Sequence, residues 1–363
     1  MRWAEQGRSG TVVMLAVAGT LLYAASRTAA AALAGRGGPA RPGWRAVGHW
    51  LPIAVTAFVA ALREQPDVAV ALTFATSVGC LSFILGVLTY LSPMEQLPAS
   101  RRGWPFVLPA ALLALIAGFS GHVTWVHATA MLLLGAALVS VWRDPALREA
   151  VVPAPVAGTP PAETQSPSIL TTGWLRTADL VLALALAAVG GWYAVDGVVR
   201  AAGSANLFPP STLTVVILSP LVTLPMLNPT PPEAPKADAG SAVSILVAVV
   251  LLNLCLLLPS LSLLWHAKTA LAGPAGAGAP ATTQVSATAP IPPVSLGAMF
   301  ENSKPLPFPL PNWRVDAVVL TVLGFVMIPV SLGRWELRRA EAAGLVLGYA
   351  VYLVLVAFAS IRP

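Results

Sequence analysis

The sequence predicts an all-α membrane protein with about ten transmembrane helices arranged as two inverted five-helix repeats. The chain has 363 residues, of which 56% are hydrophobic and only 10% are charged, whereas soluble domains carry about 25% charged residues. Several windows approach or exceed the ~20 apolar residues that cross a bilayer. A proline-containing motif also recurs at matching places in the two halves. Together these observations predict a polytopic protein with an internal repeat.

The apolar windows define the expected helices in order. The first window follows Arg2 and Arg8 and is longer than the roughly 7–15 apolar residues of a signal-peptide core, so we expect it to remain as a span. Pro52 in the second span, and Pro220 and Pro225 in the seventh, are expected to break those helices and free backbone carbonyls. The predicted spans lie near 11–34, 46–64, 67–91, 104–120, 123–142, 174–201, 211–228, 240–266, 314–333 and 337–360.

Two segments outside the spans divide the chain. Residues 11–142 form the first predicted five-helix repeat, and the Pro-rich residues 143–173 read as a flexible cytoplasmic linker. Residues 174–363 form the second repeat, which carries a Pro/Ala/Gly-rich insertion at 267–313. The end of this insertion is expected to be extended, without regular hydrogen bonding. Both segments are predicted to be solvated, with docking of a protein partner as the alternative.

The distribution of Lys and Arg predicts the orientation in the membrane. Loops on the side of the N-terminus hold eight of these residues and loops on the other side hold twelve, with Arg27 left inside the first span. Because basic loops stay in the cytoplasm, both termini are predicted to be non-cytoplasmic. The predicted location is the cell (inner or plasma) membrane, with membrane lipid as the surrounding partner.

Composition also excludes several classes of function. The net charge of +6 comes from scattered residues rather than a basic stripe, so no nucleic-acid binding is expected. The two cysteines, Cys80 and Cys255, fall in apolar spans and predict no disulfide framework. The chain has no Gly-rich phosphate loop, His-Glu-x-x-His or nucleophile elbow. We therefore expect neither an enzyme nor a bound cofactor, and we assign no catalytic or cofactor-binding residue.

The internal repeat rests on equal spacings. Pro52 and Cys80 are 28 residues apart, and so are Pro225 and Asn253. A Tyr-Ala pair recurs in the first and sixth spans as well, at Tyr23 and Tyr193. Five spans in each half place the second half upside down relative to the first. Broken helices at corresponding positions of inverted repeats indicate a binding site near the membrane midplane.

The repeated motif carries a resemblance to a known family. The two copies read Gly48-His49-Trp50-Leu51-Pro52-Ile53 and Leu221-Val222-Thr223-Leu224-Pro225-Met226. Each resembles a Gly-Thr-Ser-x-Pro-Glu motif that lacks its Glu. The segment 61–70, Ala-Leu-Arg-Glu-Gln-Pro-Asp-Val-Ala-Val, looks like the short turn between the second and third helices of that family. The membrane part thus resembles the calcium/cation antiporter superfamily, the sodium/calcium exchanger fold, as a divergent member with degenerate α-repeat motifs.

The resemblance implies where ion ligands would lie. In the family two Glu residues and nearby Asn and Ser oxygens hold the cation at the membrane centre. Carried over, the Glu positions are Ile53 and Met226. The two Asn positions are Ser77 and Cys80 in the first repeat, and Val250 and Asn253 in the second, while the Thr-Ser pairs become His49-Trp50 and Val222-Thr223.

These replacements argue against calcium as the ligand. Calcium takes 6–8 oxygen ligands, usually including carboxylates, and a dehydrated divalent ion needs compensating negative charge. No metal ligand is therefore assigned. A monovalent cation or a proton remains the expected ion, because hydroxyl, amide and backbone oxygens can hold it weakly. The candidate ion-path positions are His49, Pro52, Ser77, Thr223, Pro225 and Asn253.

Other polar residues in the spans have structural interpretations. His49 titrates near neutral pH and could carry a proton, or it could simply be hydrogen-bonded near a helix end. Asp196 and Arg200 are four residues apart and should pair on one helix face, with Arg27 as another possible partner of Asp196. Asp316 lies near the start of a span, where the helix dipole favours an acid.

Three functions stay open at this point. The first is an integral membrane transporter resembling sodium/calcium exchangers, with altered ion specificity because Ile53 and Met226 replace the acidic ligands. The second is a transport-inactive scaffold or partner subunit on the same fold, which would use its Pro-rich segments to bind proteins. The third, with least support, is a membrane enzyme or lipid-handling protein on an unrelated fold.

Overall fold

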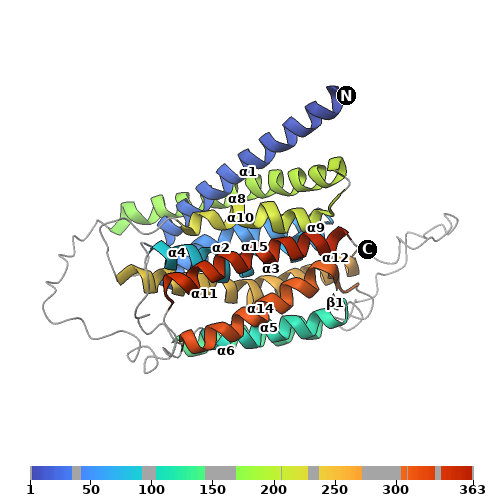
Figure 1. Ribbon diagram of the computed structural model, residues 1–363. Coiled ribbons are helices and arrows are strands. Elements are labelled where there is room, and N and C mark those ends of the chain that lie inside the picture. Colours follow the sequence, from blue (N-terminus) through green and yellow to red (C-terminus); the bar gives the residue numbers. More distant parts are fainter. Residues whose placement is uncertain are drawn as a thin grey trace, which may run out of the picture.

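The computed structural model describes nine stretches of the chain, and they form one bundle of nearly parallel and antiparallel helices (Figure 1). The start of α1 and the end of α15 lie at the same end of the bundle, on the right in Figure 1. The described stretches are residues 2–34, 42–91, 104–143, 169–205, 207–227, 237–271, 304–308, 310–331 and 337–361.

The first half of the chain contributes six α-helices, one π-helical turn and a short strand. They are α1 (Arg2–Ala34), α2 (Pro42–Leu62), α3 (Pro66–Gly79), the π turn η1 (Cys80–Ile84), α4 (Leu85–Leu91), α5 (Trp104–Phe119), β1 (His122–Val123) and α6 (Trp125–Arg143). The segments α3, η1 and α4 follow one another without a gap and correspond to one predicted span.

The second half repeats this order with more interruptions. It consists of α8 (Ile169–Ala205), α9 (Pro210–Leu213), η2 (Thr214–Leu218), α10 (Ser219–Thr223), η3 (Leu224–Leu227), α11 (Ala237–Leu252), η4 (Asn253–Leu257), α12 (Leu258–Leu271), β2 (Leu306–Pro307), α14 (Leu310–Ser331) and α15 (Arg339–Ile361). Here η2 and η4 are π turns and η3 is a 3₁₀ turn.

The bundle has the length and composition of a multi-pass membrane protein. Within the described stretches, eight helical segments are long and apolar enough to cross a membrane. The other two predicted spans correspond to the shorter apolar helices Phe106–Phe119 and Trp125–Ser140. A helix therefore lies at every predicted span, but the count of ten crossings stays a prediction.

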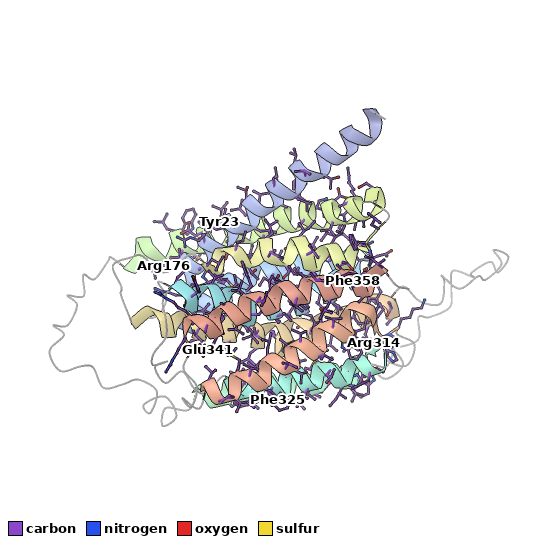
Figure 2. The ribbon with its side chains drawn as sticks, in the orientation of Figure 1. Tyr23, Arg176, Arg314, Phe325, Glu341 and Phe358 are labelled. Atoms are coloured by element: carbon purple, nitrogen blue, oxygen red, sulfur yellow. The ribbon has the colours of Figure 1, made fainter. Side chains whose placement is uncertain are left out.

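Burial separates central from peripheral helices. In the most apolar part of Pro66–Leu91, 94% of the residues are buried, against 17% in Arg339–Ile361. Figure 2 shows Phe325 on the flank of the bundle, while the charged Arg176, Glu341 and Arg314 lie toward its ends. This distribution suits a lipid-facing apolar belt with charges near the two surfaces, and it places α3 in the centre.

The two halves show the predicted internal symmetry. The π turn η1 begins at Cys80 and η4 begins at Asn253, which are the two positions that the equal spacings align. The first helices of the halves, α1 and α8, pack along each other in opposite directions (Figure 1). A π turn holds one extra residue in a helix and is often found at functional sites. Matching π turns therefore indicate a candidate functional site around Cys80 and Asn253.

The prediction of broken helices is only half right. The seventh predicted span is interrupted around Pro220 and Pro225, where α9, η2, α10 and η3 follow one another. By contrast, α2 continues through Pro52 as a single helix. Proline removes one backbone donor, but α2 packs against α1, α8 and α11, and this packing keeps it helical on both sides of Pro52.

The turn between α2 and α3 forms as predicted. Gln65 N donates to Ala60 O at 2.9 Å, and Glu64 adopts a left-handed backbone with φ 63°. Pro66 then occupies the first turn of α3, a position that needs no backbone donor.

An ion-pair network connects the turn between α2 and α3 to α8. The carboxylate of Asp196 accepts from Arg200 Nε at 2.8 Å, which confirms the predicted i,i+4 pair. Its second cationic partner is Arg63, with Nη2 at 3.3 Å from Oδ1, rather than Arg27. Arg63 also lies over the Trp192 ring, 4.2 Å from its centroid.

The end of the 267–313 insertion is more ordered than predicted. Leu306–Pro307 pairs antiparallel with β1, and Phe308 N donates to Gly121 O at 3.1 Å. Leu306 and Phe308 are buried. The expectation of an extended segment without regular hydrogen bonding is thus wrong for these residues, because their apolar side chains dock onto the bundle. Residues 272–303 lie outside the described residues, as do residues 144–168 of the predicted linker.

Helices α1 and α2 approach each other closely at Gly48. A Cβ added at this residue would lie 2.5 Å from Ala30 Cα and 2.6 Å from Ala30 N. Small residues permit such backbone contact between membrane helices. The glycine of the repeated motif therefore has a packing role.

We expect Gly48→Ala to destabilise the bundle by about 1–3 kcal/mol, the usual cost of overpacking. The matched control is Gly344→Ala on α15, because a Cβ at Gly344 meets nothing within 4 Å. Thermal unfolding in detergent measures both variants. Equal melting temperatures for the two would contradict the close approach.

A buried hydrogen bond joins α14 to α15. Tyr352 OH donates to Asp316 Oδ1 at 2.8 Å, and both side chains are only 1% exposed. The sequence suggested an acid in the first turn of its helix, but Asp316 lies beyond the first turn of α14. Its position is explained by Tyr352 rather than by the helix dipole.

Asp316→Asn should be better tolerated than Asp316→Leu, because only the amide keeps an oxygen that accepts from Tyr352. Leaving a buried donor unsatisfied costs about 1–3 kcal/mol. Comparison of the two melting temperatures in detergent tests this. A leucine variant as stable as the asparagine variant would show that the hydrogen bond contributes nothing.

Candidate functional site

The candidate site lies where the middle of the first half meets the interrupted helices of the second half. Segment α3–η1 contacts α9, η2 and α10 on one side and η4 on the other. These elements bring together five buried polar residues, which we call the polar centre: Thr76, Ser77, Ser219, Thr223 and Asn253.

The hydroxyl protons of α3 are used within the helix. Thr76 Oγ1 donates to Leu72 O at 2.7 Å, and Ser77 Oγ donates to Thr73 O at 2.8 Å. Such back-bonding satisfies the donor of a buried hydroxyl. The lone pairs of both oxygens remain available to a neighbour.

Asn253 is that neighbour. Its Nδ2 donates to Thr76 Oγ1 at 3.0 Å and to Ser77 Oγ at 3.1 Å. Because both hydroxyls already donate to backbone carbonyls, only the NH₂ end of the amide can face them. Among the described residues, Asn253 Oδ1 is therefore left buried without a donor. A buried oxygen in this state is suited to coordinate a cation or to accept a hydrogen bond from a polar ligand.

The hydroxyls of α10 face α3 at Gly79. Thr223 Oγ1 donates back to Ser219 O at 3.0 Å. A Cβ at Gly79 would lie 3.9 Å from Thr223 Oγ1 and 3.8 Å from both Ser219 Oγ and Tyr349 OH. The last two atoms are buried and interact with each other. The polar centre is thus rich in acceptor oxygens.

The structure brings together some of the residues predicted from the sequence. Ser77 and Asn253 are hydrogen-bonded, and Thr223 lies on the facing helix. Pro225 is buried in the 3₁₀ turn that follows α10. Their role in an ion path stays a prediction.

The two candidates on α2 have other surroundings. His49 Nδ1 shares a hydrogen bond of 2.9 Å with Ser26 Oγ on α1. Pro52 is buried within α2, and its carbonyl accepts from Thr56 Oγ1 at 2.7 Å. The contacts described for these two residues are with α1 and with α2 itself rather than with the polar centre.

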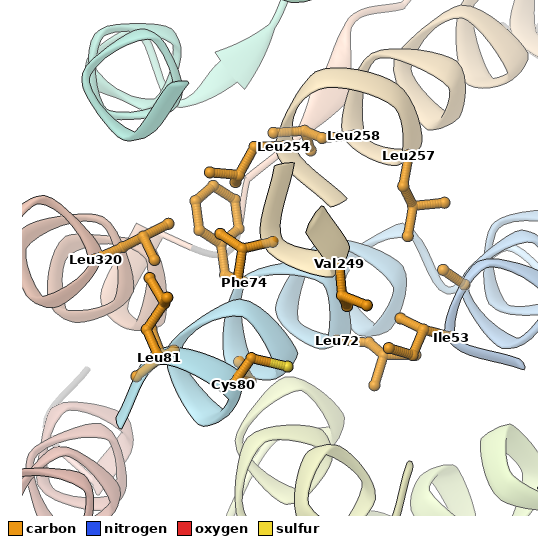
Figure 3. Packing of buried hydrophobic residues seen from close by; sticks show 14 of the residues in the cluster. Ile53, Leu72, Phe74, Cys80, Leu81, Val249, Leu254, Leu257, Leu258 and Leu320 are labelled. Atoms are coloured by element: carbon orange, nitrogen blue, oxygen red, sulfur yellow. The ribbon is translucent and has the colours of Figure 1, made fainter. Parts of the chain in front are cut away.

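The positions that correspond to the family Glu residues have changed character. Ile53 is fully buried in the apolar core that also holds Leu72 and Val249 (Figure 3). Met226 is 7% exposed, and its Sδ lies 3.6 Å from Cys80 Sγ. One acidic position is therefore filled by core packing, and the other by a sulfur contact between the two halves.

Negative charge is scarce around the polar centre. Asp316 is the one buried carboxylate within the described stretches, and its hydrogen bond goes to Tyr352. Tyr349, whose ring centroid is 5.7 Å from that of Tyr352, stands between this pair and Gly79. The same stretches contain no group of three or more His, Cys, Asp or Glu residues placed to hold a metal ion.

Several residues of this region were missed in the sequence. Thr76 and Ser219 belong to the polar centre, and Tyr349 borders it. Ser219 lies four residues before Thr223, so the sequence could have predicted that the two residues share a helix face. For Tyr349 no signal existed, because its approach to Gly79 depends on how α15 packs against η1 and α4.

Comparison with known proteins gives matches among solved structures. No known family matches the sequence, and no curated protein does so. The H⁺/Ca²⁺ exchanger CAX matches with a TM-score of 0.67 and 13% identity over 98% of this chain and 85% of that chain. Native YfkE matches with a TM-score of 0.61 and 15% identity over 97% and 95% of the two chains.

The sodium-calcium exchanger NCX_Mj, soaked with 10 mM Na⁺ and 10 mM Sr²⁺, also matches. Its TM-score is 0.55, and the 15% identity extends over 97% of this chain and 99% of that chain. These matches span nearly the whole chain, although few residues are identical. The chain therefore has the all-α membrane fold of the calcium/cation exchangers.

Proposed function

We propose that this protein is a membrane cation transporter with altered ion specificity, which moves a monovalent cation or a proton rather than calcium. The exchanger fold and the symmetry-matched π turns at Cys80 and Asn253 support transport. The replacement of both family acids by Ile53 and Met226 supports the altered specificity.

The observation that carries the proposal is the set of free acceptor lone pairs in the polar centre. Ser77 Oγ and Thr223 Oγ1 direct their protons into backbone carbonyls, and Asn253 Oδ1 has no donor among the described residues. Lone pairs without a formal charge can solvate a monovalent cation. They do not compensate a dehydrated divalent ion, which needs carboxylates.

The location that fits this function is the cell membrane. The greater number of Lys and Arg residues in the loops opposite the N-terminus supports a non-cytoplasmic position for both termini. A shared side for the two termini agrees with the start of α1 and the end of α15 at one end of the bundle (Figure 1).

A second hypothesis is a protein with the same fold that does not transport ions. The loss of both acids favours a transport-inactive scaffold or partner subunit, which would bind proteins through the Pro-rich segments 143–173 and 267–313. Most of both segments lies outside the described residues. This hypothesis predicts that the native protein moves no ion in a flux experiment.

Purified protein in proteoliposomes should carry a flux of sodium, potassium or protons and no flux of calcium. Asn253→Ala removes the amide that joins the two halves, so it should lower the monovalent flux at least about tenfold, because one interaction with a charged group is worth about 1.5–3 kcal/mol. His49→Ala tests the predicted proton role of that side chain in the same assay.

Ser262→Ala is the matched control. Ser262 is as buried as Asn253 and lies on the following helix α12, but its hydroxyl donates to Val123 O at 3.3 Å. The control should keep the native flux. A silent native protein would support the scaffold reading. Monovalent flux that neither Asn253→Ala nor His49→Ala changes would place the ion path elsewhere.

A further inference from the structure

Two sulfur atoms from opposite halves of the chain meet beside the polar centre. Cys80 opens the π turn η1, and Met226 lies in the 3₁₀ turn η3. Cys80 Sγ is 3.6 Å from Met226 Sδ and is placed to donate its proton to the thioether. Cys80 is fully buried and Met226 nearly so. Through this contact, Cys80 of the first half touches the repeated Leu-Pro motif of the second half.

Three hydroxyl oxygens lie beside Gly79, the residue that precedes Cys80. Gly79 immediately precedes Cys80, and the space at its Cβ position is bordered by Ser219 Oγ and Tyr349 OH at 3.8 Å. Both residues are buried, and their hydroxyls interact with each other. Thr223 Oγ1 borders the same space at 3.9 Å. Cys80 itself lies in the buried apolar core, and these hydroxyls border the residue that precedes it.

Ligand softness limits which cation such a pair would bind. Thiolate and thioether sulfurs select soft ions such as Cu(I), whereas carboxylate, carbonyl and water oxygens suit magnesium and calcium. A structural zinc site needs four protein ligands, and this pair supplies two sulfurs. The chemistry of the donors thus favours a soft monovalent ion over sodium, calcium or zinc.

Charge balance leads to the same class of ion. One thiolate and one monovalent cation form a neutral unit, which can be buried without a further counter-charge. A divalent cation on the same thiolate would leave a net positive charge in the bundle. The lack of an acid at Ile53 and Met226 is therefore no obstacle to a Cu(I) or Ag(I) ion.

The distance between the two sulfurs is compatible with one bridging ion. With metal–sulfur distances near the ~2.3 Å of zinc–thiolate bonds, sulfurs 3.6 Å apart enclose an angle of roughly 100° at the metal. Methionine has three rotatable bonds and a polarizable sulfur, so Met226 can open this angle toward a linear arrangement.

We propose that Cys80 and Met226 form a binding site for a soft monovalent cation, Cu(I) or Ag(I), and that this ion is the substrate class of the transporter. The proposal rests on the proposed function for its transport part only. On binding, the S–H bond of Cys80 breaks, an S–Cu bond forms and the proton leaves to bulk water. Copper stays Cu(I), so no oxidant or reductant takes part. Release is the reverse step, in which a proton displaces the metal from the sulfur.

Competition at one sulfur has a functional consequence. The proton and the metal ion exclude each other at Cys80, as metal binding to a thiol requires its deprotonation. Exchange of two ions across a membrane requires such mutual exclusion. The site would therefore couple one Cu(I) to one proton without a carboxylate.

Purified protein in detergent, under anaerobic and thiol-free conditions, should take up a single Cu(I) per chain in competition with a chromophoric Cu(I) chelator. It should release about one proton per ion in weak buffer, since metal binding displaces the thiol proton. X-ray absorption should show sulfur in the coordination shell. Ag(I) serves as a redox-inert second probe.

The variants separate this site from general thiol binding. Cys80→Ser should abolish uptake, and Met226→Leu should weaken it at least about tenfold, the scale of effect seen even for outer-shell changes at metal sites. Cys255→Ser is the control, because Cys255 is also buried but packs against Gly135 of α6. It should bind Cu(I) like the native protein. Melting temperatures verify that each variant is folded.

Three results would overturn the site: no Cu(I) or Ag(I) uptake by the native protein, unchanged uptake in folded Met226→Leu, or equal loss in Cys255→Ser. Flux assays separate this inference from the proposed function. If sodium, potassium or proton flux occurs while Cu(I) and Ag(I) do not bind, the sulfur site is wrong and the transporter stands. If Cu(I) binds through Cys80 but no ion moves, the site stands and transport is wrong.

Discussion

The polar centre depends on the contact between Asn253 and α3. This amide belongs to the second half, whereas Thr76 and Ser77 belong to the first, and both hydrogen bonds are fully buried. Their direction is fixed because the two hydroxyls donate to carbonyls of their own helix. The contact therefore holds the repeats in register and leaves Asn253 Oδ1 as an unsatisfied acceptor. One interaction thus stabilises the interface and sets the electrostatic character of the site.

The second constraint is the position of charge. The Asp196 network lies near the α2–α3 turn, and the buried Asp316 is hydrogen-bonded to Tyr352. Neither carboxylate belongs to the polar centre. Any ion bound there must therefore be coordinated by neutral oxygens or by a thiolate of Cys80. Divalent ions need more negative charge than these groups supply. The helices thus follow the exchanger architecture, while Ile53 and Met226 occupy the positions that the resemblance assigns to acidic ligands.

Local patterns in the sequence predicted much of this structure. Long apolar windows gave the helix positions, Glu64-Gln65-Pro66 gave the turn, and the spacing from Pro52 to Cys80 gave the repeat. The resemblance placed Ser77 and Asn253 among the candidate ion-path positions, but it did not predict the hydrogen bond between them. Three features depend on distant parts of the chain and were not predictable: the continuity of α2 through Pro52, the docking of Leu306–Pro307 on β1, and the Cys80–Met226 contact. Each is decided by helix packing, which periodicity and propensity do not encode.

The most direct test of the central claim is a calorimetric titration of the purified native protein with calcium, beside the Ile53→Glu/Met226→Glu double variant. The claim is that missing carboxylates, rather than a changed fold, determine the ion. The native protein should then show no binding at the ~10 µM and lower dissociation constants of carboxylate-rich calcium sensors, and the folded double variant should gain affinity. Native binding tighter than about 10 µM would contradict the account, because it would require a calcium site built without acidic ligands at these positions.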